Sequence, residues 1–553
     1  MSTHRAVAGR LAAALSTAGL LLLTPGGTAS ASALDVCASG CPFTQLGPAL
    51  AAAKNGDTVR IGPGTYTGDV AIKVSVHLVG AGADRTIIDG GGNGTVITIG
   101  TFGAPASAEP TVTIDGVTIT GGVARSSPES VPFVGSDGVI AMGGGVEVPP
   151  DAGGTGGAIV TISHSVIRGN RVAPTSAIDS GIPCPPDITI SCINGDLPFA
   201  KAAGGGIDAW GPLTLDHTTV TGNRVGSAAG LGPDVASDAD GAGIDSHLSP
   251  LTIKNSTISG NRAGATAPNG RFAEGGGLYL ESGSIAMSDS SVKDNATSLA
   301  ATMPSDLADS PMADGGGIFV GFGIPSAALR NSRITDNSAS MTNTLGDAAA
   351  DSGGIRGNSP VDMRNVDDSG NSVTAVAVPG SSGRAFSTSG AGQLAGTFRN
   401  VALDDNAVTA RSASSDAEAG GGASVFGPGT LDNADISGNR VLASGQSGFA
   451  AAAGGGLLLS DVTTLRNSQV RDNRVEADGA VAEAAGGGVF DAPVPNGPPG
   501  GALVLRNNSI TDNVLTGSPG TALLGGGVYV NGENLTASGN RIARNQPDQC
   551  IGC

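Results

Sequence analysis

The chain has 553 residues, of which 91 are glycine, and its 48 acidic residues outnumber its 29 lysines and arginines, giving a formal net charge of −19. Such an acidic excess disfavours binding to nucleic acid or to anionic membranes and favours solubility or cation binding. Valine, isoleucine and leucine recur in register between glycine, asparagine and aspartate, which indicates an all-β chain rather than a disordered one.

The N-terminus has the pattern of a secretory signal peptide. Arg5 and Arg10 precede an apolar run at residues 11–23 that is too short to span a bilayer, and small residues follow as far as Ala33. We expect residues 1–33 to be removed on export and the protein to be secreted or extracellular. No later segment has about 18 uninterrupted apolar residues, so no further membrane span is expected.

The six cysteines lie in three close pairs. They are Cys37 with Cys41, Cys184 with Cys192, and Cys550 with Cys553. In an exported chain an even number favours disulfides, and although six cysteines allow 15 connectivities, their spacing favours local pairing. The alternative for the last pair is a redox or metal dithiol, which the helix-poor context disfavours.

Most of the chain repeats one pattern, of which residues 204–225 (GGGIDAWGPLTLDHTTVTGNRV) are a clear copy. Each copy has a glycine triad, two short apolar runs, a polar step, Ile or Val, and a closing asparagine. Complete or degenerate triads begin at Gly143, Gly204, Gly241, Gly275, Gly315, Gly353, Gly390, Gly420, Gly454, Gly486 and Gly525. The spacing suits three short strands and tight turns, so we predict an all-β solenoid, a single-stranded right-handed parallel β-helix of roughly 13–14 coils.

Two kinds of position within the repeat are interpreted as structural. Period-two alternation points Leu213, Leu215 and Val220 into the coil, where equivalent residues of successive coils stack. The closing asparagines are Asn170, Asn223, Asn261, Asn295, Asn337, Asn371, Asn406, Asn439, Asn473, Asn513 and Asn540. Asparagine tolerates the left-handed turn conformation, and its amide can bond its counterparts one coil away, so we predict an asparagine ladder.

Between each closing asparagine and the next triad, 11 to 33 residues intervene, rich in Ala, Ser, Asp, Gly and Pro. We expect loops inserted at one corner of the coil, emerging on one side of the rod as either a binding face or merely tolerated loops. The predicted organisation is a signal peptide at 1–33, an N-terminal cap at 34–57, the β-helix at 58–545 and a tail with a cysteine pair at 546–553.

Three N-terminal phrases resemble the secreted pectate-lyase-like superfamily of right-handed parallel β-helix proteins. They are KNGDTVRIGPGTY at residues 54–66, IKVSVHLVGAG at 72–82 and TIIDG at 86–90. The resemblance implies that a short alanine-rich helix before them caps one end of the stack. The Gly-Gly-Gly-Ile and Asn-Ser-x-Ile-x-x-Asn phrases also resemble polymorphic outer-membrane and adhesin-like repeat proteins, although the Phe-x-x-Asn signature of those proteins is not kept.

The resemblance also implies two kinds of polysaccharide chemistry: lyases with aspartate-bound Ca²⁺ and an Arg or Lys base, and hydrolases with two or three carboxylates. The chain lacks the Asn-Thr-Asp, Gly-His-Gly and Arg-Ile-Lys motifs of polygalacturonase-type hydrolases. Candidate residues for an enzyme would be Asp314, Asp351, Asp367, Asp368, Asp404 and Asp405, with Arg330, Arg364 or Arg399 as bases. His164 and His217 occupy equivalent turn positions and are expected to stack, but two ligands without a third make a weak metal site.

Charges at the ends of the inserted segments form a second pattern. An arginine follows the closing asparagine in six copies, at Arg171, Arg224, Arg262, Arg440, Arg474 and Arg541, and an acid precedes many triads. We expect exposed ion pairs such as Arg224 with Asp240. The central acids Asp314, Asp351 and Glu418 lack such an arginine, so they are either a solvated acidic strip or a weak Ca²⁺ site.

These observations favour a secreted, non-catalytic β-helix protein that presents its loop-bearing face to a macromolecule, with polysaccharide or a surface protein as the partner. The alternative is an extracellular polysaccharide lyase or glycoside hydrolase of the pectate-lyase-like kind. No cofactor is required by the first reading, and Ca²⁺ is the only one that the sequence suggests.

Overall fold

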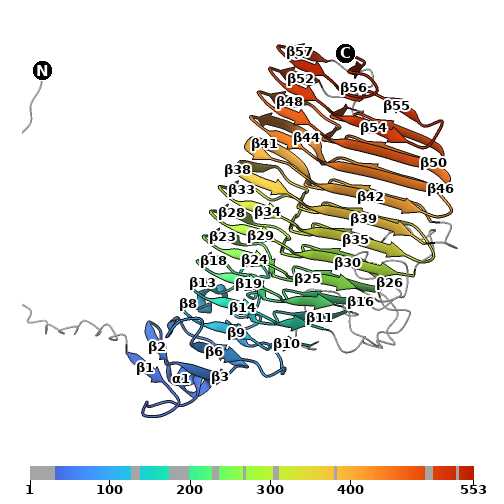
Figure 1. Ribbon diagram of the computed structural model, residues 1–553. Helices are drawn as coiled ribbons and strands as arrows, with labels where there is room; N and C mark the ends of the chain where they lie inside the picture. The colour runs from blue at the N-terminus through green and yellow to red at the C-terminus, as the bar shows by residue number, and fades with distance from the viewer. Residues whose placement is uncertain are drawn as a thin grey trace, which may run out of the picture.

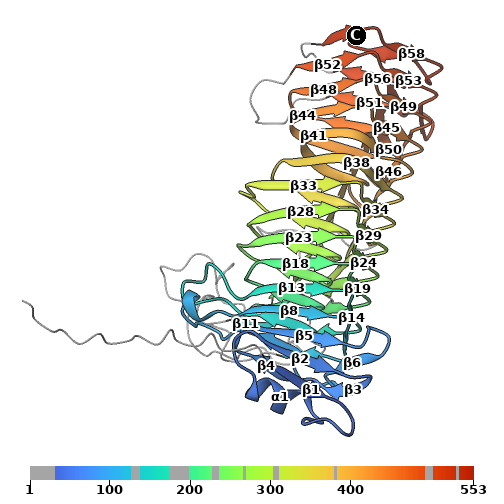
Figure 2. The same cartoon turned by 90° about the vertical axis from the view of Figure 1, so that its left-hand side faces the viewer.

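The computed structural model describes residues 32–125, 138–173, 199–226, 236–265, 269–302, 311–378, 383–491, 502–530 and 535–553. Its strands stack into a long rod that rises from the N-terminus to the C-terminus (Figures 1 and 2). Strands pair in parallel with their equivalents one coil away, as β17 (Ile207–Ala209) does with β22 (Ile244–Ser246). The chain is a right-handed parallel β-helix, as the repeat predicted.

A coil contributes strands to two sheets. In the copy that begins at Gly204, β17, β18 (Leu213–Asp216) and β19 (Thr219–Thr221) belong to a 39-stranded sheet. The strands β20 (Arg224–Gly226) and β21 (Ala236–Asp240) belong to a 20-stranded sheet. Thirteen successive pairings join fourteen first strands from β4 (Val70–Ile72) to β59 (Cys550–Ile551), in agreement with the predicted number of coils.

The inserted segments are not only loops. Their described residues form the 20-stranded sheet, here called the wing, in which one strand of each coil runs outward from the body and a second returns. In two C-terminal coils the whole segment is a single strand: β46 (Arg440–Ala453) and β50 (Arg474–Ala485). The wing has its own core, built mainly of alanine with some valine, because short side chains let its two layers approach closely. Figure 1 shows the wing strands to the right of the body.

The body has a separate core of Leu, Ile and Val. Leu213, Leu215 and Val220 are all buried, and Leu213 stacks on Leu251 of the next coil in register. This arrangement confirms the predicted inward positions. Each coil leaves alternate side chains of its strands outside the core, and these outward positions carry the polar groups described below.

At the N-terminus α1 (Leu46–Ala52) packs on the first coils and buries Leu46, Ala49 and Leu50, as expected for a cap. The first strand β1 (Ala33–Val36) pairs with β2 (Asp57–Ile61). Disulfides join Cys37 to Cys41 and Cys550 to Cys553, whereas Cys184 and Cys192 lie outside the described residues. Among the described residues no helix combines the length and apolarity needed to cross a bilayer.

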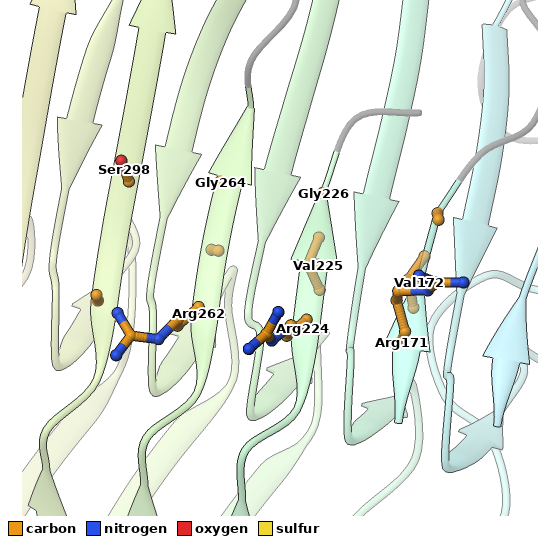
Figure 3. A pocket seen from close by; sticks show the side chains of 11 residues that line it. Arg171, Val172, Arg224, Val225, Gly226, Arg262, Gly264 and Ser298 are labelled. Atoms are coloured by element: carbon orange, nitrogen blue, oxygen red, sulfur yellow. The ribbon is translucent and has the colours of Figure 1, made fainter. Parts of the chain in front are cut away.

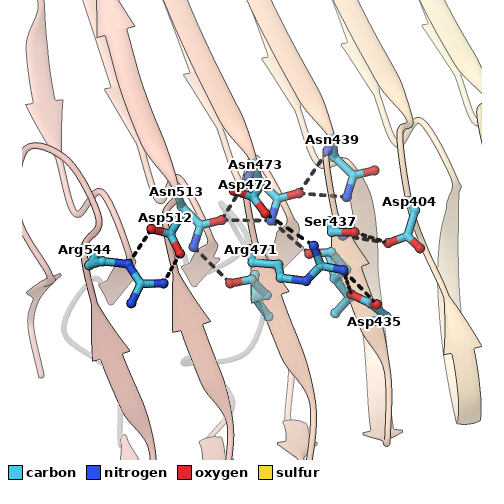
Figure 4. A network of polar contacts seen from close by, with 12 residues as sticks. Asp404, Asp435, Ser437, Asn439, Arg471, Asp472, Asn473, Asp512, Asn513 and Arg544 are labelled. Atoms are coloured by element: carbon cyan, nitrogen blue, oxygen red, sulfur yellow. Dashed lines mark hydrogen bonds and ion pairs between the residues drawn. The ribbon is translucent and has the colours of Figure 1, made fainter.

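The asparagine ladder runs through the body along the rod. The Asn439 backbone N–H and side-chain amide both donate to Oδ1 of Asn473, at 3.0 and 2.9 Å, and Asn473 binds Asn513 in the same way (Figure 4). The ladder then continues to Asn545, not to Asn540 as predicted. Asn540 accepts hydrogen bonds from Asn508 in a second ladder at the preceding turn.

The predicted reason for the asparagines was also wrong in one respect. The left-handed conformation belongs to the residue before each ladder asparagine, such as Asp472 with φ 58° or Gly438 with φ 68°. The asparagine itself contributes its buried amide, which satisfies backbone groups that the tight turn leaves unpaired. Asparagine is therefore selected by hydrogen bonding, and the preceding Gly or Asp by backbone conformation.

Candidate functional site

The three acids predicted to bind Ca²⁺ do not form one site. Asp314 and Asp351 are neighbours on β31 (Met312–Asp314) and β36 (Ala348–Asp351). Between them lies Arg356, whose Nε is 3.4 Å from Asp314 Oδ2 and whose Nη1 contacts Asp351. The guanidinium supplies the positive charge that a Ca²⁺ ion would otherwise bring, and the two carboxylates are largely buried rather than solvated, so neither predicted alternative describes this pair.

Glu418 is displaced from these two acids. The register carries Asp351 to Thr388 and then to Gly420, so Glu418 lies two residues before the equivalent position. Its side chain is exposed on the surface of the wing. Glu418 was grouped with Asp314 and Asp351 because each of these acids comes shortly before a glycine triad. The triad that follows Glu418 is shifted by one residue relative to the triads of neighbouring coils, so the grouping was wrong.

A different cluster of polar groups is assembled where the returning wing strands meet the first strands of the body. We call Asp208, Asp245, His247 and Glu281 the corner cluster. Asp208 and Asp245 are register partners in the middle of β17 and β22. His247 follows β22, and its backbone N–H donates to Ala209, which places its ring beside both carboxylates. These positions are outward relative to the body core but are covered by the wing.

The distances within the corner cluster are short. His247 Nε2 lies 3.2 Å from Asp208 Oδ1 and 3.3 Å from Asp245 Oδ1, and its Nδ1 lies 2.5 Å from Glu281 Oε2. The side chains of Asp208 and Asp245 are fully buried and that of His247 is 3% exposed, while the Glu281 side chain is 49% exposed. Trp210 stacks on the imidazole at 4.3 Å between ring centroids.

Burial and charge shift the protonation of the cluster in opposite directions. Burial raises the pKa of Asp245 to about 7, against the attraction of the His247 charge. The hydrogen bond from His247 lowers the pKa of Glu281 to about 2. Burial alone would lower the pKa of His247, but the charges of Asp245 and Asp208 raise it overall. Asp245 therefore keeps its proton more readily than an exposed aspartate does, which lessens the repulsion between the buried carboxylates.

Further acids extend this corner along the rod. Burial raises the pKa of Glu147, one coil before Asp208, to about 8 and that of Asp238 to about 7. Lys201 is 3.1 Å from Asp240, and its Nζ lies 5.6 Å from the Tyr279 ring, so it connects a wing strand with a first strand. With one lysine already paired, the corner remains strongly acidic.

A second candidate site lies on the face of the wing that points away from the corner cluster. Arg171, Arg224 and Arg262 are register partners on three successive outward strands, and all three are exposed. They line a hollow of about 410 Å³ whose floor includes Gly226 and Gly264 (Figure 3). None of the three arginines has an ion pair with a residue in the described parts of the chain.

The predicted ion pair between Arg224 and Asp240 is therefore wrong. Val225 and Ala239 both point into the wing core, so Arg224 and Asp240, which are their sequence neighbours, point away from each other on opposite faces. Asp240 pairs with Lys201 instead. In the same way Arg474 contacts Glu476, two residues along its own strand, at 3.2 Å.

The row of arginines continues along the rod with a gap of small residues. The column runs from Arg262 through Ala296, Ser338, Ser372 and Ala407 to Arg440 and Arg474. We call this column, from Arg171 to Arg474, the arginine strip. Beside its central part a parallel column on the same face presents the hydroxyl groups of Ser298, Ser340, Thr374 and Thr409.

The residues suggested for a lyase or hydrolase do not meet in one place. Asp367 is half-buried, with its Oδ2 4.0 Å from Arg333 Nε. Asp368 is buried in the body core, and Asp404 accepts hydrogen bonds from Ser437. Arg330 and Arg364 both contact Asp362. His164 and His217 stack at 5.1 Å as predicted, and the ring of each lies 2.8 Å from one carboxylate.

The corner cluster was missed because each of its residues looks like ordinary variation within the repeat. One signal was available: aligned on their triads, GGGIDAW and GAGIDSH place aspartate at the same position of two successive coils. Later copies have Tyr279, Phe319 and Arg356 at that position. Sequence alone did not show that this column faces the wing.

No protein-family model and no curated protein matches the chain. A solved structure, the A-module of mannuronan C-5 epimerase AlgE6 from Azotobacter vinelandii, is similar at 14% identity over 90% of this chain and 94% of that chain, with a TM-score of 0.32.

Two further solved structures are similar at 12% identity. One is the catalytic domain of a GH87 α-1,3-glucanase, solved with nigerose; the match covers 92% of this chain and 68% of that chain, with a TM-score of 0.25. The other is the A-module of the Azotobacter vinelandii mannuronan C-5 epimerase AlgE4; the match covers 89% of this chain and 94% of that chain, with a TM-score of 0.22.

Proposed function

We propose that this protein is exported and binds an anionic polysaccharide along the arginine strip of its wing. The observation that carries the proposal is the register of Arg171, Arg224 and Arg262, which repeats one exposed guanidinium per coil without a described acidic partner. Like charges separated by one coil, about 4.8 Å, repel one another unless solvent or an anion compensates them. An anionic ligand would relieve that repulsion.

The repeat of the strip favours an extended chain with regularly spaced anionic groups. A uronate or sulfated polysaccharide carries its acid groups at sugar-ring intervals, and guanidinium groups bind carboxylate and sulfate oxygens through paired N–H donors. The glycines at the floor of the hollow let a ligand approach the backbone, and the neighbouring serine and threonine hydroxyls can bond sugar hydroxyls. The ligand would then lie along the rod axis, across successive coils.

Overall charge argues against nucleic acid as the ligand. Duplex DNA carries one charge per about 1.7 Å, and a protein with a net charge of −19 repels such a density. The arginine strip is a local positive surface on an acidic protein. It therefore suits a polyanion whose charges are more widely spaced than those of DNA. Export is consistent with the two described disulfides, which persist in oxidising compartments.

The test is direct binding of the full mature chain to polygalacturonate, alginate, a sulfated glycan and a neutral glucan. We expect binding to the acidic polymers only, weakening as salt rises because screening reduces these contacts. The triple variant Arg171→Gln, Arg224→Gln, Arg262→Gln should lose at least about tenfold in affinity. The matched control is Arg330→Gln with Arg364→Gln, two exposed arginines on the other sheet that already contact Asp362.

Equal binding of the neutral glucan, or unchanged affinity in the triple variant, would overturn the proposal. The same incubations also test the alternative of a lyase or hydrolase. Unsaturated products or new reducing ends, proportional to protein and lost on heating, would establish turnover. Binding without either product would favour the non-catalytic function.

A further inference from the structure

We propose that Asp208, Asp245 and His247 bind one divalent transition-metal ion, with Glu281 holding the histidine in place. This site is on the opposite face of the wing from the arginine strip and does not depend on the function proposed for that strip. Its three ligand atoms, one from each side chain, all lie within 4.8 Å of one another. The inference rests on the spacing of these atoms, on the unpaired oxygens of the aspartates, and on the contacts that orient the imidazole.

The spacing suits a small metal ion. His247 Nε2 is 3.2 Å from Asp208 Oδ1 and 3.3 Å from Asp245 Oδ1. Zinc bonds to nitrogen and oxygen ligands of about 2.0–2.1 Å place two ligands of a tetrahedral site about 3.3–3.4 Å apart. A metal ion seated between the three groups could thus reach all three with only small side-chain movements.

The second observation is that Asp245 has the His247 ring 3.3 Å from Oδ1 but no hydrogen bond to either oxygen within the described residues. Asp245 is fully buried. Asp208 Oδ2 is likewise buried without a described partner. The imidazole can bring only one Nε2 proton, and its hydrogen bond goes to Asp208. Because an unpaired buried charge is strongly unfavourable, Asp245 points to a cation that the protein side chains do not provide.

The contacts of His247 are those that orient a metal-binding imidazole. Its Nδ1 is 2.5 Å from Glu281 Oε2, so an Nδ1–H donor there leaves the Nε2 lone pair directed at the two aspartates. Trp210 lies flat against the ring, with 12° between the planes, and restricts its rotation. This arrangement of carboxylate, histidine and metal ligands fixes both the tautomer and the direction of the lone pair.

The donor set identifies the class of metal. One imidazole nitrogen with two carboxylate oxygens suits Zn²⁺, Mn²⁺, Fe²⁺ or Co²⁺, whereas Ca²⁺ and Mg²⁺ prefer sites made of oxygen alone. Two ionised aspartates balance a dication. Three protein ligands also leave a coordination position open, as in zinc sites that bind water or substrate. Glu281, half exposed, marks the side of the cluster that solvent reaches.

The chain offers a built-in reporter for the test because Trp210 is its single tryptophan. The full-length mature protein, without a histidine tag and stripped with chelator, is titrated with Zn²⁺ while tryptophan fluorescence and heat are recorded. We expect one equivalent to bind, with a change in Trp210 emission and a rise in melting temperature. Mn²⁺ should compete, and Ca²⁺ at the same concentration should not.

Two isosteric variants test a proposed ligand, Asp245, and the residue that orients His247, Glu281. Asp245→Asn should weaken Zn²⁺ binding by about 100-fold or more, and Glu281→Gln by about 10- to 100-fold, since hydrogen-bond partners of metal ligands typically contribute that much. Glu281 is half exposed, so its variant tests the site even where Asp245→Asn fails to fold. The matched control is His217→Gln, which removes an exposed, carboxylate-bonded and stacked histidine and should leave the titration unchanged.

The proposal is overturned if the wild-type chain binds no stoichiometric Zn²⁺, or if Asp245→Asn binds it as tightly as the wild type does. In either case the cluster is a proton-sharing group in which imidazolium bridges the carboxylates. A result in which Zn²⁺ binds but His217→Gln abolishes binding would also contradict it, because the metal would then occupy the exposed histidine pair.

Discussion

The side-chain amide of Asn295 donates a 3.0 Å hydrogen bond to Asn337 Oδ1 one coil further on, and the Asn295 backbone N–H donates to the same oxygen at 3.0 Å. Asn295 in turn accepts the equivalent pair of bonds from Asn261. Both side chains of the linked pair are fully buried. The ladder therefore couples each coil to its neighbours through polar contacts that no water can replace.

Replacing Asn295 with alanine should lower the free energy of unfolding by about 3–5 kcal/mol, because the buried Asn261 backbone N–H and side-chain amide lose their acceptor and the Ile258 carbonyl loses its donor. The substitution adds no backbone strain, since Asn295 is not in the left-handed region. Asn331→Gly is the matched control. Asn331 belongs to an exposed amide ladder at a turn with φ 48°, where glycine is tolerated and water replaces the lost bonds. Equal losses in urea unfolding would contradict the role assigned to burial.

Asp368 occupies a position of the body core that other coils fill with apolar residues, as its register partner Ile334 shows. It is fully buried, and its Oδ2 has no described partner, while Oδ1 accepts a 2.7 Å bond from Asn371. Burial raises the pKa of Asp368 well above its ordinary range, and the neighbouring Asp367 charge raises it further. The folded protein thus binds a proton more tightly here than the unfolded chain does.

The sign of the pH dependence follows from this difference. As pH rises above the unfolded pKa of about 3.9, the unfolded chain releases the proton and the folded chain keeps it, so stability falls until the folded group ionises. Asp368→Val should remove this loss, giving a gain in melting temperature that is larger at pH 8 than at pH 5. Asp289→Asn, at an exposed turn of another coil, should show no such pH-dependent gain. A gain for Asp368→Val that is equal at both pH values would contradict the proton assignment.

Ser32 lies inside the segment predicted to be removed, yet its N–H and hydroxyl groups both donate to Asp57 Oδ1 at 2.8 Å. These bonds lower the pKa of Asp57, the backbone N–H of Ser32 contributing most. We therefore predict cleavage after Ala31, at the small-residue site Ala29-Ser30-Ala31, so that Ser32 is the first mature residue. N-terminal sequencing of the secreted protein checks this. A mature chain beginning at Leu34 would support the original prediction instead.

The fold could be predicted from the sequence because every coil of the β-helix repeats the same inward apolar positions and the same asparagine turn. Leu215 and Ile253 occupy equivalent core positions of successive coils, and each closing asparagine lies at the same turn, so a period of one coil carries most of the information. The prediction failed at Asn540 because two asparagine ladders run side by side near the C-terminus and the prediction took the wrong one. Asn545 lies 20 residues after Gly525, which matches the 20 residues from Gly241 to Asn261, so the spacing favoured Asn545.

Pairings between strands that are not repeat equivalents were beyond that reasoning. The sequence separates Arg224 from Asp240 by an inserted segment, and only the thin alanine core of the wing shows that their strands face opposite ways. The same layering brings Lys201 of a returning strand to Tyr279 of the body and encloses His247 between carboxylates. These contacts depend on how two sheets pack, which the repeat period does not specify.

Arg356 gives the last prediction, because it lies where Ca²⁺ was one of two predicted alternatives. Its side chain is 18% exposed between Asp314, which is 2% exposed, and Asp351. Burial raises the pKa of Asp314, and the Arg356 charge opposes that rise. We expect millimolar Ca²⁺ to leave the melting temperature of the wild-type protein unchanged at this site, since the guanidinium already neutralises the two carboxylates.

Arg356→Gln should destabilise the protein by about 3–5 kcal/mol, because it leaves buried acids without a counter-charge. Ca²⁺ should then recover part of the loss, since two neighbouring carboxylates can share a dication. The control Arg330→Gln breaks an exposed contact with Asp362 and should cost no more than about 1 kcal/mol. A rise in the melting temperature of the wild type with Ca²⁺ would contradict the role given to Arg356 and favour the Ca²⁺ alternative that the sequence left open for Asp314 and Asp351.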